Sequence, residues 1–137
     1  MDAHRRLVAA KGGIVLESIG QIAINVKDTA RARAFYRDVL GLKHLFDAGP
    51  TLAFFQCGNV RLMLSPPSKP EHDNPGSIIY YRVADLQATH AAMVAKGAHF
   101  EQGPHVVATM PDHELCMAFL RDSEGNLLAL MEERRPG

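Results

Sequence analysis

Length, composition and charge exclude several classes for this chain. Its 137 residues are enough for one domain with a hydrophobic core of its own. Fifteen Lys and Arg residues balance fifteen Asp and Glu residues, and no basic stripe indicates a nucleic-acid partner. No apolar run reaches the ~20 residues of a membrane span. The N-terminus lacks an apolar signal segment, and Cys57 and Cys116 lack disulfide or metal spacing, which predicts a cytoplasmic protein with reduced thiols.

The first half of the chain predicts a strand, a helix and three further strands. Residues 1–17 form an N-terminal extension whose role the sequence leaves open. Apolar and polar residues alternate over residues 20–26, as in a strand with one buried face. Asp28 is a suitable N-cap for a helix that ends at Gly41. Three strands follow, over residues 42–47, 52–57 and 60–65.

A proline-rich linker, residues 66–76, separates the two halves and is expected to hold neither a helix nor a central strand. The second half then repeats the order of the first, because Asp85 caps a helix that Gly97 ends. A turn is predicted over residues 121–126. The strands of this half are expected over residues 77–83, 99–102, 106–109, 115–120 and 127–131.

The two halves form an internal repeat. Val26 and Asp28 recur as Val83 and Asp85 in the corresponding places. Such a repeat predicts two modules, one over residues 18–65 and one over 77–133, in one sheet system. The apolar strand residues should lie under the helices, and the opposite face should form a concave wall. The helix-facing set is Ile22, Ile24, Leu62, Leu64, Ile79, Tyr81, Leu128 and Leu130.

The segments "IAINVKD", "AFYRDVLGL", "VRLMLSPP", "RVADL" and "FLRDSEGNLLAL" together resemble the vicinal oxygen chelate superfamily. That group includes glyoxalase I, extradiol dioxygenases and bleomycin resistance proteins. The resemblance covers nearly the whole chain. It implies an α+β fold of two tandem βαβββ modules, which form a curved, barrel-like mixed sheet with helices on the outer face. A single glyoxalase/bleomycin-resistance-like domain would then span residues 18–137.

The resemblance also supplies a test for a metal site. Enzymes of the superfamily place two ligands in each module, and the corresponding positions here are Gln21, Met63, Ile78 and Ala129. Only Gln21 carries a donor suited to a hard or borderline divalent cation, whereas a metal site needs about three or more converging ligands. The sequence therefore predicts no metal and no other cofactor.

Strand alternation selects the residues of the concave cleft, because residues two apart in a strand share a face. This lining is an apolar floor with amides, a hydroxyl pair and two guanidinium groups, which suits a small organic ligand, anionic or aromatic. The arginines could instead pair with surface acids at the rim, and the methionines could fill a collapsed cavity. The predicted cleft residues are Gln21, Asn25, Arg61, Met63, Ser65, Ile78, Tyr80, Arg82, Ala129 and Met131.

Two functions remain open at this point. The first is a small-molecule-binding protein in which the metal site of the family is largely lost. The alternative is a superfamily enzyme, a lyase, isomerase (epimerase) or dioxygenase with no identified catalytic residue. It would use cleft acids and bases or an altered site for divalent Zn, Ni, Mn or Fe involving His105, His113 or Glu114. The resemblance implies a homodimer, and a curved sheet also leaves edges to be covered.

Overall fold

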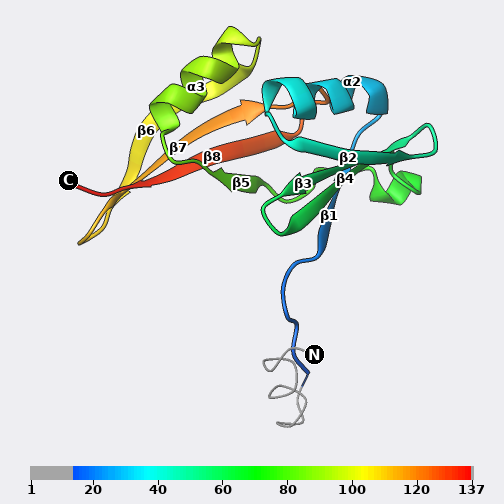
Figure 1. Cartoon of the computed structure of the whole chain (residues 1–137), viewed down its shortest axis with the longest axis horizontal. Helices are drawn as coiled ribbons and strands as arrows, with labels where there is room; N and C mark the ends of the chain where they lie inside the picture. The colour runs from blue at the N-terminus through cyan, green and yellow to red at the C-terminus, as the bar shows by residue number, and fades with distance from the viewer. Residues whose placement is uncertain (1–13, 137) are drawn as a thin grey trace.

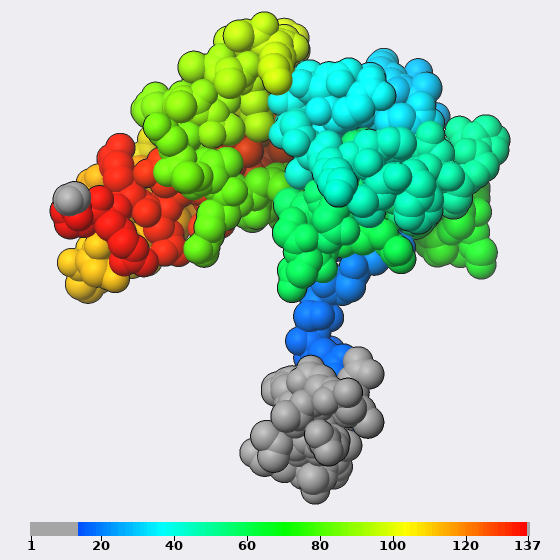
Figure 2. All heavy atoms as spheres, viewed as in Figure 1, coloured from blue at the N-terminus to red at the C-terminus, as the bar shows by residue number. Residues whose placement is uncertain are grey.

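The computed structural model describes residues 14–136. Residues 1–13, most of the predicted N-terminal extension, lie outside the described residues. Residues 14–20 run away from the sheets on the side opposite to the helices (Figure 1), and Figure 2 shows this segment projecting from the body. Ile14 and Leu16 within it are 97% and 89% exposed. No helix in the described part of the chain is both long and apolar enough to cross a bilayer.

The first module contains one four-stranded mixed sheet, here called sheet A. Its strands lie in the order β1-β4-β3-β2, with β1 parallel to β4 and the other neighbours antiparallel. The turn between β3 and β4 contains Gly58 with a φ of 59°, a conformation that glycine adopts without steric cost. Its elements are β1 (Gln21–Asn25), α2 (Thr29–Ala34), η1 (Phe35–Val39), β2 (Lys43–Ala48), β3 (Leu52–Cys57) and β4 (Val60–Ser65).

The second module repeats this arrangement in sheet B, whose strand order is β5-β8-β7-β6 with β5 parallel to β8. The predicted α+β class with two βαβββ modules is thereby confirmed. The two sheets are separate and not closed, and both helices lie on the outer side of the curved surface that the sheets form (Figure 1). Its elements are β5 (Ile79–Arg82), α3 (Leu86–Ala95), β6 (His99–Thr109), β7 (Glu114–Arg121) and β8 (Leu127–Arg134).

Both helices begin at the predicted aspartates. The Asp28 carboxylate accepts a hydrogen bond from the Arg31 amide at 3.0 Å, and that of Asp85 accepts one from the Ala88 amide at 3.0 Å. These bonds satisfy amides that have no partner within the helix. The first helix differs from the single α-helix expected, because it changes after Ala34 into a wider π-helical turn, Phe35–Val39.

Two further expectations are corrected. The linker holds a short 3-10 turn, η2 (Pro70–His72), which begins with a proline, the residue best tolerated where a helix starts. The two strands expected over 99–102 and 106–109 are one strand, β6, whose pairing with β7 is interrupted by register shifts. Pro104 lies within it, and an edge strand accommodates a residue without an amide hydrogen.

A hydrophobic core fills the space between each sheet and its helix. Burial of this apolar surface stabilises the fold by about 25 cal/mol per Å². Tyr81 packs against both cores and so joins the modules. The predicted helix-facing residues are confirmed: Ile24, Leu62, Leu64, Leu128 and Leu130 are buried in these cores, and Ile22, Ile79 and Tyr81 pack against them.

The turn between β7 and β8 forms hydrogen bonds that connect the second module to the first. Glu124 accepts hydrogen bonds from the amides of Lys27 and Asp28 at 2.5 and 2.9 Å, next to the start of α2. Asp122, 6% exposed, accepts one from the buried Tyr36 hydroxyl at 2.8 Å. The predicted turn 121–126 therefore fixes how the two sheets lie relative to one another.

Candidate ligand-binding walls

The face of sheet A that points away from α2 is here called wall A. Strand pairing places twelve positions on it, because directly opposite residues of neighbouring strands share a face. Five of them are the predicted cleft residues of the first module. The positions of wall A are Gln21, Ala23, Asn25, Lys43, Phe46, Ala48, Leu52, Phe54, Gln56, Arg61, Met63 and Ser65.

Polar contacts on wall A centre on Gln21. Its carbonyl oxygen Oε1 accepts a hydrogen bond from Arg61 Nε at 2.7 Å, and its amide Nε2 lies 3.8 Å from Met63 Sδ. The Arg61 guanidinium also lies over the Phe54 ring, with its central carbon 5.5 Å from the ring centroid. A cation in this position is attracted by the negative face of the ring. Three predicted cleft residues are thus brought into one cluster.

An aromatic floor lies beside this cluster. The rings of Phe46 and Phe54 are stacked, with centroids 4.6 Å apart and planes 22° apart. Phe54 is 8% exposed beneath its neighbours, whereas Phe46 is 47% exposed and offers its ring to solvent. The sequence interpretation missed both phenylalanines. Alternation along 52–57 could have suggested Phe54, but a bulge between His44 and Phe46 changes which β2 residues face this wall.

The corresponding face of sheet B is here called wall B. The Tyr80 and Phe119 rings meet edge to face with centroids 6.0 Å apart, and both adjoin Ala129, which is 0% exposed. Arg82 forms an ion pair with Glu133 at 3.5 Å. One of the two predicted cleft arginines therefore pairs with an acidic residue, as the alternative interpretation of the sequence expects. The residues on this wall include Tyr80, Arg82, Met117, Phe119, Ala129 and Met131.

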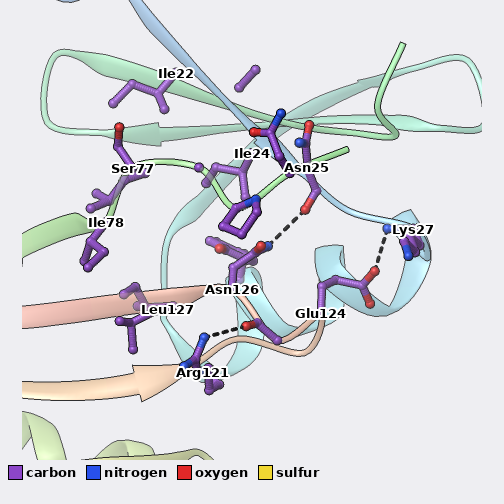
Figure 3. A pocket seen from close by; sticks show the side chains of 18 of the residues that line it. Ile22, Ile24, Asn25, Lys27, Ser77, Ile78, Arg121, Glu124, Asn126 and Leu127 are labelled. Atoms are coloured by element: carbon purple, nitrogen blue, oxygen red, sulfur yellow. Dashed lines mark hydrogen bonds between the residues drawn. The ribbon is translucent and has the colours of Figure 1, made fainter. Parts of the chain in front are cut away.

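A cavity of ≈ 860 Å³ lies where the two modules meet (Figure 3). Of the ten predicted cleft residues, only Asn25 and Ile78 line it. Asn25 donates from its side chain to the His72 carbonyl at 2.9 Å, and its own backbone carbonyl accepts from the Asn126 side-chain Nδ2 at 2.9 Å. The remaining predicted residues lie on the two walls. The cavity is lined mainly by β1, residues 73–79 and the β7–β8 turn.

Two tyrosines, the buried Tyr36 and the half-buried Tyr81, border this cavity. Burial, and after it the negative charge of Asp122, raises the pKa of Tyr36, so its phenol stays protonated and donates to that carboxylate. Burial likewise raises the pKa of Tyr81. The Tyr81 hydroxyl is buried and has no hydrogen-bond partner within residues 14–136. It therefore offers an unused donor at the junction of the modules.

The sequence profile of the Glyoxalase/Bleomycin resistance protein/Dioxygenase superfamily matches residues 18–130. The chain belongs to this superfamily. Among solved structures, a lactoylglutathione lyase from Agrobacterium tumefaciens has a TM-score of 0.65 at 24% identity, over 85% of this chain and 94% of that one. An antibiotic binding protein from Streptomyces sp. CB03234 has a TM-score of 0.71 at 21% identity, over 88% and 99%. These identities show a shared fold alone, and no curated protein is significantly similar in sequence.

The residues at the positions that the sequence resemblance assigns to the metal ligands do not have the donor chemistry of a divalent-cation site. Met63, Ile78 and Ala129 offer no hard donor, and the Gln21 carbonyl already accepts from the Arg61 guanidinium at 2.7 Å. A permanent positive charge thus lies directly beside the one suitable oxygen, and it would repel a metal ion. Gln21 and Met63 also lie on wall A, whereas Ala129 lies on wall B.

The altered metal site that would involve His105, His113 or Glu114 has no support in the described residues. His113 Nδ1 lies 2.8 Å from Asp112, Glu114 pairs with Arg134 at 2.7 Å, and His105 Nδ1 lies 2.8 Å from the Gly103 carbonyl. Each side chain thus has a partner of its own. No group of three or more His, Cys, Asp and Glu side chains in residues 14–136 is arranged to hold a metal ion.

Proposed function

We propose that this superfamily member binds a small organic ligand on its concave walls without a metal ion. The observation that carries the proposal is the hydrogen bond from Arg61 Nε to Gln21 Oε1. It supports the proposal because the Arg61 cation lies beside Gln21, the position that the resemblance assigns to the first metal ligand. The wall then recognises its ligand through a guanidinium and aromatic rings instead of a coordinated metal.

Apolar surface on both walls supports ligand binding. Phe46 is 47% exposed on wall A, and Tyr80 is 44% exposed on wall B. Covering such rings with an apolar ligand gains about 25 cal/mol per Å² removed from water. The antibiotic binding protein of the same fold is a relative whose described role is also binding. We infer a cytoplasmic location from the two free thiols, Cys57 and Cys116.

The experiment combines metal analysis with ligand binding. Protein purified without chelator should contain far less than one equivalent of Zn, Ni, Mn or Fe by mass spectrometry. The midpoint of its thermal unfolding should then be measured in the presence of each member of a library of aromatic and aliphatic organic compounds. Some compounds should raise this midpoint, and the rise should be the same with and without a chelator. A stoichiometric transition metal, or binding that the chelator abolishes, would refute the proposal in favour of a metal-dependent lyase, isomerase or dioxygenase.

We further propose that the protein is a homodimer. Within one chain the two walls belong to separate sheets, and a second copy facing them would enclose the ligand between walls of different copies. Ile78 and Tyr80 are 39% and 44% exposed, and Ile14 and Leu16 of the projecting segment are almost fully exposed, so apolar surface is available for contact.

Sedimentation velocity at micromolar concentration tests the assembly. The unmodified chain should sediment as a dimer, and the Ile14→Asp, Leu16→Asp double variant should shift toward monomer because charges would enter an apolar contact. Ser18→Asp adds a charge to the same segment at a polar position and serves as the control. A wild-type protein that is monomeric throughout would contradict the dimer.

A further inference from the structure

Arg61 differs from every other arginine in residues 14–136. No carboxylate of the described residues lies within ion-pair distance of it, although it is on a central strand of sheet A. Each of the remaining arginines pairs with Asp or Glu. The paired arginines are Arg31, Arg33, Arg37, Arg82, Arg121, Arg134 and Arg135.

The Arg61 side chain is nevertheless held in place. Its Nε donates to Gln21 Oε1 at 2.7 Å, and its planar group lies over the Phe54 ring. Both contacts use the Nε edge and the flat face of the guanidinium. Its two terminal nitrogens donate to no acceptor in the described part of the chain. They remain available as a fork of parallel N–H groups, the geometry that matches the two oxygens of a carboxylate.

The charge of the surrounding wall favours an anion. Lys43 lies in the same cross-strand row as Arg61, with Gln56 between them, because Lys43 pairs with Gln56 and Gln56 pairs with Arg61. No Asp or Glu occupies any of the twelve positions of wall A. Two cations without a neighbouring carboxylate produce a local positive potential on a protein whose formal net charge is zero.

The apolar part of the wall favours a flat ligand. The Phe54 ring contacts both Arg61 and Phe46, so the guanidinium and the exposed Phe46 ring are neighbours of one buried aromatic side chain. A planar ring stacked on Phe46 would therefore carry a substituent within reach of Arg61. Aromatic pairs of this kind contribute beyond the area they bury.

We propose that the ligand of wall A is an aromatic carboxylate. The Arg61 fork binds the carboxylate, Phe46 stacks on the aromatic body, and Gln21 acts as a positioning residue that holds Arg61. Lys43 adds to the attraction at longer range. This inference rests on the proposed metal-independent binding function and names the chemical class of its ligand.

The test uses three probes with the full-length protein. 2-Naphthoate has both features, 2-naphthalenemethanol has the ring without the charge, and cyclohexanecarboxylate has the charge without the ring. Titration calorimetry should show that the wild-type protein binds 2-naphthoate most tightly. Arg61→Gln should weaken 2-naphthoate binding by about tenfold to hundredfold, the usual effect of losing a charge-assisted hydrogen-bond pair. The same variant should leave the alcohol within about twofold, because ring stacking is retained.

Gln21→Glu separates the charge of Arg61 from its position. The introduced carboxylate keeps Arg61 in place but neutralises it, so 2-naphthoate affinity should fall as in Arg61→Gln while the alcohol is unaffected. Added NaCl should weaken 2-naphthoate binding by wild type and have little effect on the alcohol. Arg37→Gln is the matched control, because Arg37 is an exposed arginine on the helix side that pairs with Asp38.

Three outcomes would overturn the inference. Equal affinity for 2-naphthoate and its alcohol would mean that charge is not recognised. A loss of 2-naphthoate affinity in Arg82→Gln without a loss in Arg61→Gln would assign the carboxylate to wall B. Wild-type protein that binds none of the three probes would exclude aromatic acids as the class. If the broader library still gives metal-independent ligands in that last case, the proposed function stands and only the ligand class fails.

Discussion

Glu124 should contribute more to stability than a carboxylate on a turn normally does. It accepts hydrogen bonds from the Lys27 and Asp28 amides at 2.5 and 2.9 Å and pairs with Arg31, while its own side chain is 5% exposed. Glu124→Ala removes the acceptor from both amides, at about 1–1.5 kcal/mol each. The Arg31 side chain is 60% exposed, so its ion pair adds less than about 1 kcal/mol. The expected loss is about 3 kcal/mol.

The pH dependence identifies the cause of this loss. Burial alone would raise the pKa of Glu124, but the hydrogen bonds from the Asp28 amide, Arg31 and the Lys27 amide lower it below its usual value. A carboxylate with a lowered pKa in the folded state stabilises the protein above its unfolded pKa, about 4.3, and loses that contribution as the pH falls through the folded value. The difference between wild type and Glu124→Ala should therefore be full at neutral pH and shrink below about pH 4.

Urea unfolding followed by circular dichroism at several pH values measures both effects. The control is Glu101→Ala, because Glu101 pairs with Arg121 but its side chain is 51% exposed, which predicts a loss below about 1 kcal/mol. The reasoning is refuted if Glu124→Ala costs no more than this control at neutral pH. It is equally refuted if the loss is unchanged in acid.

Two further substitutions test the contacts around the first helix and its repeat, with the free energy of unfolding in urea as the measurement. Tyr36→Phe should cost about 1–2 kcal/mol, because it removes the hydrogen bond to the buried Asp122 carboxylate without changing the packing of the ring; a cost near zero would show that the bond does not join the modules. Asp28→Ala and Asp85→Ala should each cost about 1 kcal/mol as lost helix caps, with the corresponding Asn variants nearly neutral; a loss as large in the Asn variants would argue against capping.

The repeat of the fold could be predicted because its signals are local. Asp28 and Asp85 each cap a helix by bonding an amide three residues on, and alternating apolar residues define which strand face is buried. The single strand β6 could not be predicted in the same way. Its residues around Pro104 lose the regular alternation because register shifts change the pairing with β7, and such shifts depend on the partner strand.

The site could be predicted only in part for a similar reason. Strand alternation places Gln21, Arg61 and Met63 on one face, but only the folded sheet shows that these three side chains contact each other. Alternation along residues 52–57 places the adjacent Phe54 and Phe55 on opposite faces and suggests Phe54 for the ligand wall, but both are equally apolar and the pattern alone leaves the assignment undecided. The pairing of Phe54 with Met63 decides it.

Arg61 also explains why restoring the superfamily's donors should not by itself restore a metal site. A carboxylate introduced at position 63 would lie two residues along the same strand from Arg61 and on the same face. A guanidinium binds a carboxylate through paired hydrogen bonds and carries a permanent charge. The new acid would therefore pair with Arg61 before it could bind a cation. The position of Ala129 adds a second obstacle, since this residue is 0% exposed beside Tyr80 and Phe119 and a larger side chain would disturb the packing.

The last prediction is that Met63→Glu, Ile78→His and Ala129→Glu together give a protein that retains far less than one zinc per chain after loading and desalting. Adding Arg61→Ala to the triple variant should raise the retained zinc, because the competing cation is gone and the Gln21 oxygen is released. The measurement is zinc per chain by mass spectrometry, with circular dichroism to show that each variant is folded. A triple variant that holds a full equivalent of zinc with Arg61 present would contradict the argument, because the guanidinium would then not exclude the metal. A gain in bound zinc that appears only when Arg61 is removed would show that the Arg61 guanidinium, a positive charge on wall A, occupies the introduced donors in place of a metal ion.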